Sequence, residues 1–365
     1  MARAAPLSRG VPLPSACVPL AHRVDEELAR FLSGQRQAFL PQDPGVTVLF
    51  DELDRVVASG GKRLRPLFCL LGHRAAGGEA DDRAIRAAAA LELLHTFAIV
   101  HDDVMDRSPT RRGVAASWVH LAEEHRRASH RGDAEGYGTS AAILLGDLAL
   151  VLADAALLGA GFGPDRLLPA LGRYARMRTE VVAGQFLDVL AAHRGAADEA
   201  EARRIAVLKS GGYTVEGPLH IGALLAGADD GLLAALSRYG VALGEAFQLR
   251  DDVLGVFGDP AVTGKDRDSD LREGKRTVLV AKAVASASDA DRRLLVERLG
   301  RPDLSTEELE RARAVIEATG ALAATLELID ERVSVAKAGL RDSGISGEPA
   351  ILLEEMADLV AVRLG

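Results

Sequence analysis

The sequence has little of what defines several common classes of protein. Its 365 residues include only two cysteines, which excludes a disulfide framework and a cysteine-rich zinc site and fits a reducing, cytoplasmic compartment. Aromatic residues make up 4%, and because strands favour aromatic and β-branched residues, the composition favours helices with an aliphatic core. Basic residues number 44 against 53 acidic ones, and the net charge of −9 argues against a nucleic-acid partner.

The sequence also lacks a convincing membrane-spanning segment. The best candidate, residues 141–163, is apolar but contains Asp147 and Asp154, each of which would cost roughly 2.5–3.5 kcal/mol near the centre of a bilayer. We therefore interpret this segment as a buried helix. The first 20 residues contain four prolines and no apolar run of the kind found in a secretory signal, so we expect residues 1–20 to form a flexible tail without a targeting role.

Helical periodicity covers most of the chain beyond residue 20. Apolar residues recur three and four positions apart, no strand pattern is clear, and no linker rich in proline and serine interrupts residues 21–365. The sequence therefore predicts one all-α domain over residues 21–365, with polar surface connections at 123–138 and 259–274. Helices are expected at 24–39, 46–58, 84–104, 139–158, 167–190, 232–256 and 279–296, with weaker patterns at 307–319, 322–340 and 350–362.

Three carboxylates follow the apolar segment 91–100, at Asp102, Asp103 and Asp106. In a helix Asp102 and Asp106 share a face, whereas Asp103 points about 100° away. Negative charge is unfavourable near a helix C-terminus, so these acids need a nearby cation. Oxygen ligands of this kind suit Mg²⁺, which binds one or two carboxylates together with water and substrate phosphates. A solvated helix end is the alternative.

Arginines come directly after this first acidic motif, at Arg107, Arg111 and Arg112. The guanidinium group binds phosphate through paired hydrogen bonds. Carboxylates for a metal followed by arginines for an anion are what a metal–diphosphate site needs. An exposed cluster of salt bridges is the alternative.

A second acidic motif, Asp251 and Asp252, follows another apolar helical segment and comes shortly after Gln248. The polar stretch that follows contains Lys265, Asp266, Asp268, Asp270, Lys275 and Arg276. The two acidic motifs could face each other across one cavity and contribute to a cluster of Mg²⁺ ions around a diphosphate.

A third cluster, GGKRLRP at residues 60–66, places three cations between two glycines and a proline. Glycine suits the end of a helix, and proline suits the first turn of the next one. Lys62, Arg63 and Arg65 would then lie beside the free N–H groups of a helix N-terminus, which is a good anion site. An exposed basic turn is the alternative. The sequence has no GxxxxGK[ST] motif, which argues against a P-loop nucleoside triphosphatase.

Other polar positions carry less information singly. His95 lies in the apolar segment before the first acidic motif, where a histidine is more often a satisfied core residue. Lys209 and Ser210 are expected to end a helix, where a lysine is often only a favourable terminal charge. Gln185 and Asp188 lie within an apolar helix and need buried partners.

Taken together, these residues resemble those of the trans-isoprenyl diphosphate synthases, the polyprenyl synthetase family. The matching segments occur in the family's order: GGKRLRP (60–66), ELLHTFAIVHDDVMDRSPTRRG (92–113), LLGD (144–147), GQFLD (184–188), FQLRDD (247–252) and GDPAVTGKDRDSDLREGKRT (258–277). The resemblance implies an all-α fold of mostly antiparallel helices around a deep central cavity, in a homodimer. It also implies Mg²⁺-dependent condensation of isopentenyl diphosphate with an allylic diphosphate (dimethylallyl, geranyl or farnesyl), with three Mg²⁺ ions when diphosphate is bound.

The resemblance implies roles for individual residues. Metal binding falls to Asp102, Asp106 and Asp251, with Asp103 and Asp252 in the same motifs. The isopentenyl diphosphate site would comprise Gly61, Lys62, Arg65, His95 and Arg112. Groups on the allylic side would be Arg111, Lys209, Lys265 and Lys275, with Gln248 and Ser210 near the developing cation.

Three positions bear on activity and product. The family's second motif typically ends in a third acid, where this chain has Gly255, and this weakens the case for a second metal site. Phe97 and Ala98 lie about one helical turn before Asp102, so a ring at Phe97 can block a tunnel that Ala98 leaves open. In having a large residue at the fifth position before the motif, the sequence resembles the geranylgeranyl diphosphate synthases of the family. We expect a C20 product, with C15 the nearest rival.

Three other hypotheses about the function remain open at this point. A terpene cyclase shares the metal-triggered ionisation but has no need for the GGKRLRP cluster or paired arginines. A non-catalytic subunit of a heteromeric synthase is supported by Gly255 and opposed by the intact first motif. A purely structural helical scaffold would have no reason to place so many acids at helix ends.

Overall fold

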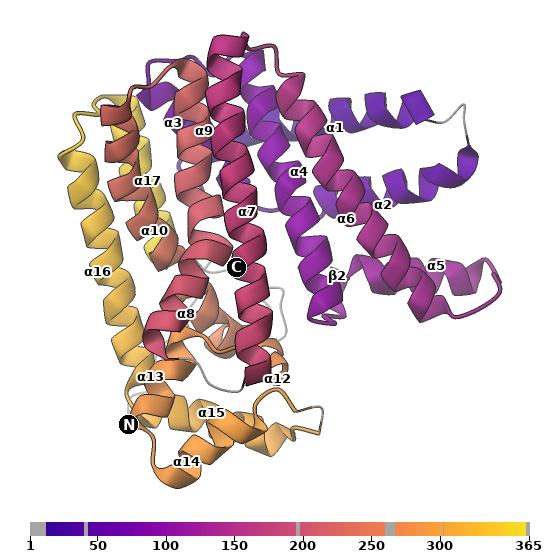
Figure 1. The fold of residues 1–365 in the computed structure, drawn as a ribbon, viewed down its shortest axis with the longest axis vertical. Helices are drawn as coiled ribbons and strands as arrows, with labels where there is room; N and C mark the ends of the chain where they lie inside the picture. Colours follow the sequence, from indigo (N-terminus) through magenta and orange to yellow (C-terminus); the bar gives the residue numbers. More distant parts are fainter. Residues whose placement is uncertain (1–11, 40–42, 195–197, 260–266, 302, 363–365) are drawn as a thin grey trace.

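The computed structural model describes residues 12–39, 43–194, 198–259, 267–301 and 303–362. Nearly all of the regular structure in these ranges is helical (Figure 1), which confirms the all-α fold class. The helices are α1 (Cys17–Phe39), η1 (Pro44–Val46), α2 (Thr47–Ala58), α3 (Leu64–Ala75), α4 (Asp82–Met105), α5 (Ser117–Arg127), α6 (Ala134–Leu158), α7 (Pro164–Arg194), α8 (Glu199–Ala206), η2 (Val207–Glu216), α9 (Gly217–Ala226), α10 (Asp230–Phe257), α12 (Ser269–Glu273), α13 (Val278–Ser286), α14 (Asp289–Arg293), η3 (Leu294–Arg298), α15 (Thr306–Ala318), α16 (Ala321–Arg341) and α17 (Glu348–Val362). Two-residue strands β1 (Thr110–Arg111) and β2 (Val114–Ala115) form an antiparallel hairpin.

The long helices run roughly along the long axis of the molecule (Figure 1) and pack in a series of neighbours. Contacts join α6 to α4, α4 to α3, α3 to α9, α9 to α7, and α7 through η2 to α10 and α16. In Figure 1, α1 and α2 project to one side of this bundle, and α12 to α15 cover its lower end. One cluster of buried apolar side chains extends from α1 to α17, so we propose that the described helices form a single domain.

Two helices, α4 and α6, are long and apolar enough to cross a membrane. Of their most apolar windows, 67% and 50% respectively are buried inside the protein. A core helix has the same length and composition, so this property is weak evidence for a membrane span. The segment 141–163, singled out above, falls largely within α6.

The N-terminal helix begins earlier than expected. α1 starts at Cys17, and both Cys17 and Leu20 are buried, so the predicted tail at 1–20 extends too far. Pro19 lies in the first turn of α1, where a backbone N–H has no partner within the helix and proline costs little.

Several connections also differ from expectation. The stretch predicted as a connection at 123–138 contains the end of α5 and the start of α6, where the Asp133 side chain accepts hydrogen bonds from the first turn. The helix predicted at 279–296 is broken at Ala287, whose backbone is extended, and Ser288 then caps α14. The predicted loop at 259–274 contains the short helix α12.

Glycines bring pairs of helix backbones into direct contact. A Cβ built on Gly222 of α9 would lie 2.7 Å from the carbonyl carbon of Cys69 on α3. A Cβ built on Gly244 of α10 would lie 2.8 Å from the Cα of Gly211 in η2. No side chain fits at either crossing, so α3 is held against α9 and η2 against α10 by main-chain contact.

Candidate active site

A cavity of about 1000 Å³ opens among the long helices. This volume is at the upper end of the range for small-molecule sites. One part of its lining is charged and is described below. Another part is apolar and is formed mainly by α4 and α7, with the side chains Phe97, Ala98, Ile99, Val181, Val182, Phe186 and Val189.

The first acidic motif occupies the last turn of α4 and is joined to the β1–β2 hairpin. Asp103 is buried, and it accepts a hydrogen bond from Nε of Arg111 at 2.8 Å, while a terminal nitrogen of Arg111 lies 3.2 Å from Asp102. Burial alone would lower the pKa of Arg111, but the two carboxylates raise it above its ordinary value. Asp103 is thus held by an arginine, whereas Asp102 also lines the cavity.

Lys209 reaches the first acidic motif from η2, a π-helical segment that continues from α8. Its Nζ lies 2.6 Å from Asp188 and 3.3 Å from Asp102, and Nε2 of Gln185 lies 3.2 Å from the same carboxylate. The expectation that a helix ends at Lys209 is wrong. The chain continues through this point in the wider π form, which is often found at functional sites. The lack of a side chain at Gly184 of α7 allows η2 to approach α7 closely. A Cβ built on Gly184 would lie only 2.4 Å from the backbone nitrogen of Lys209 and would collide with it.

The second acidic motif lies near the C-terminal end of α10. Gln248 donates a hydrogen bond from Nε2 to Asp252 at 2.6 Å. Burial raises the pKa of Asp252 to about 8. The hydrogen bond from Gln248 opposes this shift, and the negative charges of Asp270 and Asp251 add to it.

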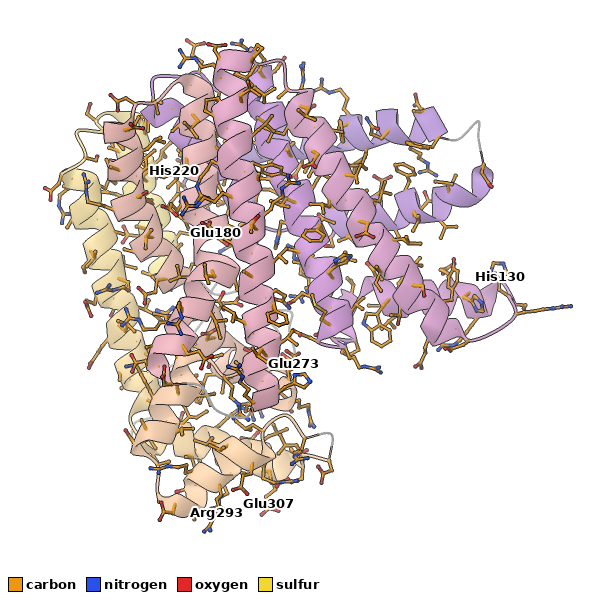
Figure 2. All side chains as sticks on the ribbon, in the orientation of Figure 1. His130, Glu180, His220, Glu273, Arg293 and Glu307 are labelled. Atoms are coloured by element: carbon orange, nitrogen blue, oxygen red, sulfur yellow. The ribbon has the colours of Figure 1, made fainter. Side chains whose placement is uncertain are left out.

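Lys275 joins the first acidic motif to acids of α12. Its Nζ lies 3.2 Å from Asp106, 3.4 Å from Asp270 and 2.7 Å from Glu273, which is labelled in Figure 2. Burial would lower the pKa of Lys275, but these carboxylates hold it well above its ordinary value. A fixed positive charge therefore lies between Asp106 of α4 and the acids of α12.

A separate group of cations lies around the turn between α2 and α3. Arg112 donates a hydrogen bond to the carbonyl of Gly60 and covers Gly61, where a Cβ would lie 3.0 Å from its guanidinium. Arg65 donates to the hydroxyl of Thr214 at 2.9 Å. The buried Nε of Arg65 has no hydrogen-bond partner among the described residues, as expected of a donor kept for a ligand.

Tyr213 of η2 lies between two of the residues in this group. The guanidinium carbon of Arg65 is 4.1 Å from the centre of the Tyr213 ring, and Nδ1 of His95 is 3.1 Å from its hydroxyl. Burial lowers the pKa of His95 well below its ordinary value, and the positive charges of Arg65 and Arg112 lower it further. A neutral imidazole therefore faces the cavity beside permanent cations.

Two cationic groups, one of them paired with carboxylates, thus share one cavity with an apolar wall. The family model for polyprenyl synthetase matches residues 46–316 of the chain. This chain belongs to the polyprenyl synthetase family. It is accordingly a prenyltransferase, one that condenses isopentenyl diphosphate with an allylic diphosphate to give a short trans-prenyl diphosphate.

Individual relatives agree with this assignment. The chain is 38% identical over 271 residues to a geranylfarnesyl diphosphate synthase of Aeropyrum pernix, covering 73% of this chain and 79% of that protein. It is 32% identical over 331 residues to a geranylgeranyl diphosphate synthase of Mycobacterium tuberculosis, covering 90% and 86%. Its structure is similar to that of geranylgeranyl pyrophosphate synthase from Corynebacterium glutamicum complexed with isoprenyl diphosphate and magnesium, with a TM-score of 0.91, 36% identity and coverage of 94% and 98%.

Most of the residues singled out from the sequence line this cavity of the synthetase. They are Gly61, Lys62, Arg65, His95, Phe97, Ala98, Asp102, Arg111, Arg112, Lys209, Ser210, Gln248, Asp251, Asp252 and Lys275. Asp103 and Asp106 lie beside it and reach it through their ion pairs with Arg111 and Lys275. Lys265 lies outside the described residues.

Sequence reasoning missed Tyr213, noted Asp270 only as one of the acids that follow the second motif, and gave Asp188 little weight. All three line the cavity of the synthetase. A buried acid in an apolar helix needs a partner, and that signal could have led from Asp188 to Lys209. Nothing in the local pattern marks Tyr213, which faces Arg65 and His95 only because η2 is π-helical.

Proposed function

We propose that this prenyltransferase forms geranylgeranyl diphosphate, a C20 product, and that its residues divide the work as follows. The observation that carries the proposal is that two cationic groups and an apolar wall line the same cavity. Lys62, Arg65, His95 and Arg112, beside Gly61, would hold isopentenyl diphosphate. Arg111, Lys209 and Lys275 would hold the allylic diphosphate beside the acids of α4 and α10.

Mg²⁺ suits the donors available. Among the described residues no three acidic or histidine side chains converge on one point, so the protein alone offers no closed metal cage. Mg²⁺ does not need one, since it typically takes one or two carboxylates and fills its other positions with water and substrate phosphate. Asp102, Asp106 and Asp251 would hold the ions, which we propose to be three in number when diphosphate is bound. When bound, the ions neutralise charge that builds up on the leaving group.

The protein's own groups complete the reaction. Arg111, Lys209 and Lys275 stabilise the diphosphate as the allylic C–O bond breaks and its electron pair leaves with oxygen. The apolar wall excludes water from the resulting allylic cation, and the oxygens of Gln248 and Ser210 face it. The double bond of isopentenyl diphosphate, held close by Arg65 and its neighbours, attacks this cation. A proton is then lost from the new cation, and the released diphosphate accepts it.

Product length would be set on α4. Phe97 and Ala98 line the cavity one turn below Asp102, and the Phe97 ring packs edge-on against His101 with ring centres 4.9 Å apart. Below them lies a void of about 10 Å³, no larger than one water molecule, which is also lined by Arg178. We infer that the Phe97 ring forms the floor on which the tail of a C20 product ends.

The synthetase would act as a cytoplasmic homodimer. Apolar side chains remain exposed along α6, namely Ile143, Leu144, Val151 and Leu158. A row of exposed apolar side chains of this kind is typical of a protein–protein interface. Both cysteines are buried and unpaired, which supports a reducing compartment.

The test is incubation of the purified chain with Mg²⁺, isopentenyl diphosphate and each allylic starter, followed by measurement of product chain length. We expect farnesyl diphosphate to be extended by one unit to C20 and little longer product to accumulate. Products that stop at C15 or continue to C25 would refute the length assignment. If no starter is extended, the non-catalytic subunit is the correct interpretation.

A further inference from the structure

The space beside Gly255 is occupied by a carboxylate from another part of the chain. Gly255 lies on α10 one turn after Asp251 and close to Asp252. A Cβ built on Gly255 would lie 2.5 Å from Cγ of Asp270 and closer still to one of its oxygens. The three atoms nearest to that Cβ all belong to the carboxyl group of Asp270. The glycine therefore provides the room into which Asp270 fits.

Asp270 is held in this position by the packing of α12. Arg313 of α15 donates one hydrogen bond to the carbonyl of Val256, at 2.9 Å, and another to the carbonyl of Arg267, at 3.0 Å. It thereby ties the start of α12 to the end of α10. At the other end of α12, Gly274 has φ +71° and packs against Gly300, whose Cα would lie 2.7 Å from an added Cβ. The carboxylate of Asp270 is therefore fixed over Gly255 by contacts on both sides.

The charges around Asp270 are those of the proposed diphosphate site. Asp270 lines the same cavity as Asp251 and Asp252. One of its oxygens lies 3.4 Å from Nζ of Lys275, which is also 3.2 Å from Asp106 of the first motif. The carboxylate is thus on the cavity side of α10, one turn beyond Asp251, where a third acid of the second motif would otherwise be expected.

We propose that Asp270 replaces the missing third acid of the second motif and helps to hold the Mg²⁺ ion on the Asp251 side of the diphosphate. The proposal rests on the proposed function, because it assigns Asp270 to the metal–diphosphate site described there. Gly255 is then a requirement of the arrangement and not a defect. An aspartate at position 255 and an aspartate at position 270 would compete for the same space. Either aspartate alone could supply the third negative group of the site.

This exclusion makes an exchange experiment possible. Four variants are compared with the parent: Asp270→Asn, Asp270→Ala, Gly255→Asp, and the double variant Gly255→Asp/Asp270→Ala. The measurements are Mg²⁺-dependent binding of inorganic diphosphate by calorimetry and the number of Mn²⁺ ions bound with diphosphate by electron paramagnetic resonance. Asp289→Asn, which removes an exposed acid at the start of α14, is the charge-matched control and should bind as the parent does.

We expect Asp270→Asn and Asp270→Ala to weaken Mg²⁺-dependent diphosphate binding by roughly 10–100-fold, the usual effect of losing a group that supports a metal site. Gly255→Asp alone should also weaken binding, because two carboxyl groups compete for one space. The double variant should regain most of the affinity lost in Asp270→Ala. Parent-like binding by Asp270→Asn, or a double variant no better than Asp270→Ala, would overturn the proposal.

Failure of this proposal can be told apart from failure of the proposed function. If the parent binds Mg²⁺ and diphosphate but condenses no substrate, the proposed function fails and the exchange can still be measured. If the parent condenses substrate and Asp270→Asn binds metal–diphosphate normally, only the role of Asp270 fails. The Asn variant keeps the shape of the side chain, so circular dichroism and thermal unfolding that match the parent exclude misfolding as the cause.

Discussion

Arg63 holds the turn between α2 and α3, and replacing it would test how the proposed isopentenyl diphosphate site is built. Its side chain is 5% exposed, and its backbone is left-handed with φ 50°. The guanidinium donates to Glu92 at 2.7 Å, to Asp25 at 2.6 Å and to the carbonyl of Val57 at 2.7 Å. Because the side chain of Glu92 is also 5% exposed, loss of Arg63 would leave a buried carboxylate without the cation that neutralises it.

The expected size follows from that burial. Arg63→Met should destabilise the protein by about 3–5 kcal/mol, the usual cost of removing one partner of a buried ion pair. With an unfolding entropy of about 2.1 cal/mol/K per residue over 365 residues, this corresponds to a fall in Tm of about 4–7 °C. The double variant Arg63→Met/Glu92→Met should recover most of the loss, because replacing a whole buried pair by apolar groups is often neutral.

Thermal unfolding at fixed protein concentration measures the change, and steady-state kinetics reports its effect on the site. The KM for isopentenyl diphosphate should rise more than that for the allylic substrate, because the turn relaxes on one side of the cavity only. Arg127→Met is the matched control, since its 64% exposed side chain pairs with surface glutamates and its loss should cost at most about 0.5 kcal/mol. A Tm for Arg63→Met within about 1 °C of the parent would refute the reasoning.

Four further predictions concern the site. Asp102→Ala should lower kcat by at least roughly 100-fold with an unchanged circular dichroism spectrum, and near-normal turnover at saturating Mg²⁺ would contradict its role. Arg65→Ala should raise the KM for isopentenyl diphosphate far more than that for the allylic partner, so equal effects in the kinetic assay would count against the assignment. Phe97→Ala should lengthen the products and Ala98→Phe should shorten them, and chromatography showing no change in either would place the floor elsewhere. The imidazole of His95, whose pKa is lowered, should stay neutral by NMR at pH 6.5 in the free protein. The imidazole of His95 binds a proton more readily in the unfolded chain than in the folded protein, so His95 should make the protein less stable as the pH falls below about 6.5. An NMR titration midpoint of His95 near about 6.5 in the folded protein would disprove the lowered pKa.

The long helices could be predicted from the sequence because their apolar spacing is sustained. The patterns over 84–104 and 232–256 match α4 and α10 within two residues at each end. The shorter α9 is apolar nearly all round, so it has no periodic face to detect. The π form of η2 could not be predicted either, because it depends on close approaches at Gly184 and Gly244 that exist only after folding.

Some residues of the candidate site could likewise be predicted from the sequence and others could not. Its acids and cations could be predicted where they cluster along the chain, as Asp102 with Arg111 or Lys62 with Arg65. Partners drawn from separate elements could not, because proximity in space leaves no mark in a local pattern. Asp270 is the clearest case. In the sequence, Gly255 marks only the absence of the third acid of the second motif, whereas in the structure the packing of α12 against α10 brings the carboxyl group of Asp270 beside Gly255.

The glycine crossings separate two properties of the synthetase that could otherwise change together. α3, which carries Arg65, is seated on α9 at Gly222, and η2, which carries Lys209, is seated on α10 at Gly244. Main-chain contact therefore seats both elements that carry the proposed diphosphate-binding cations. If Phe97 forms the floor proposed above, the depth of the cavity is set by a side chain instead. Under the proposed function, substitutions at Phe97 and Ala98 would accordingly alter the length of the product while leaving the alignment of the two reacting carbons unchanged.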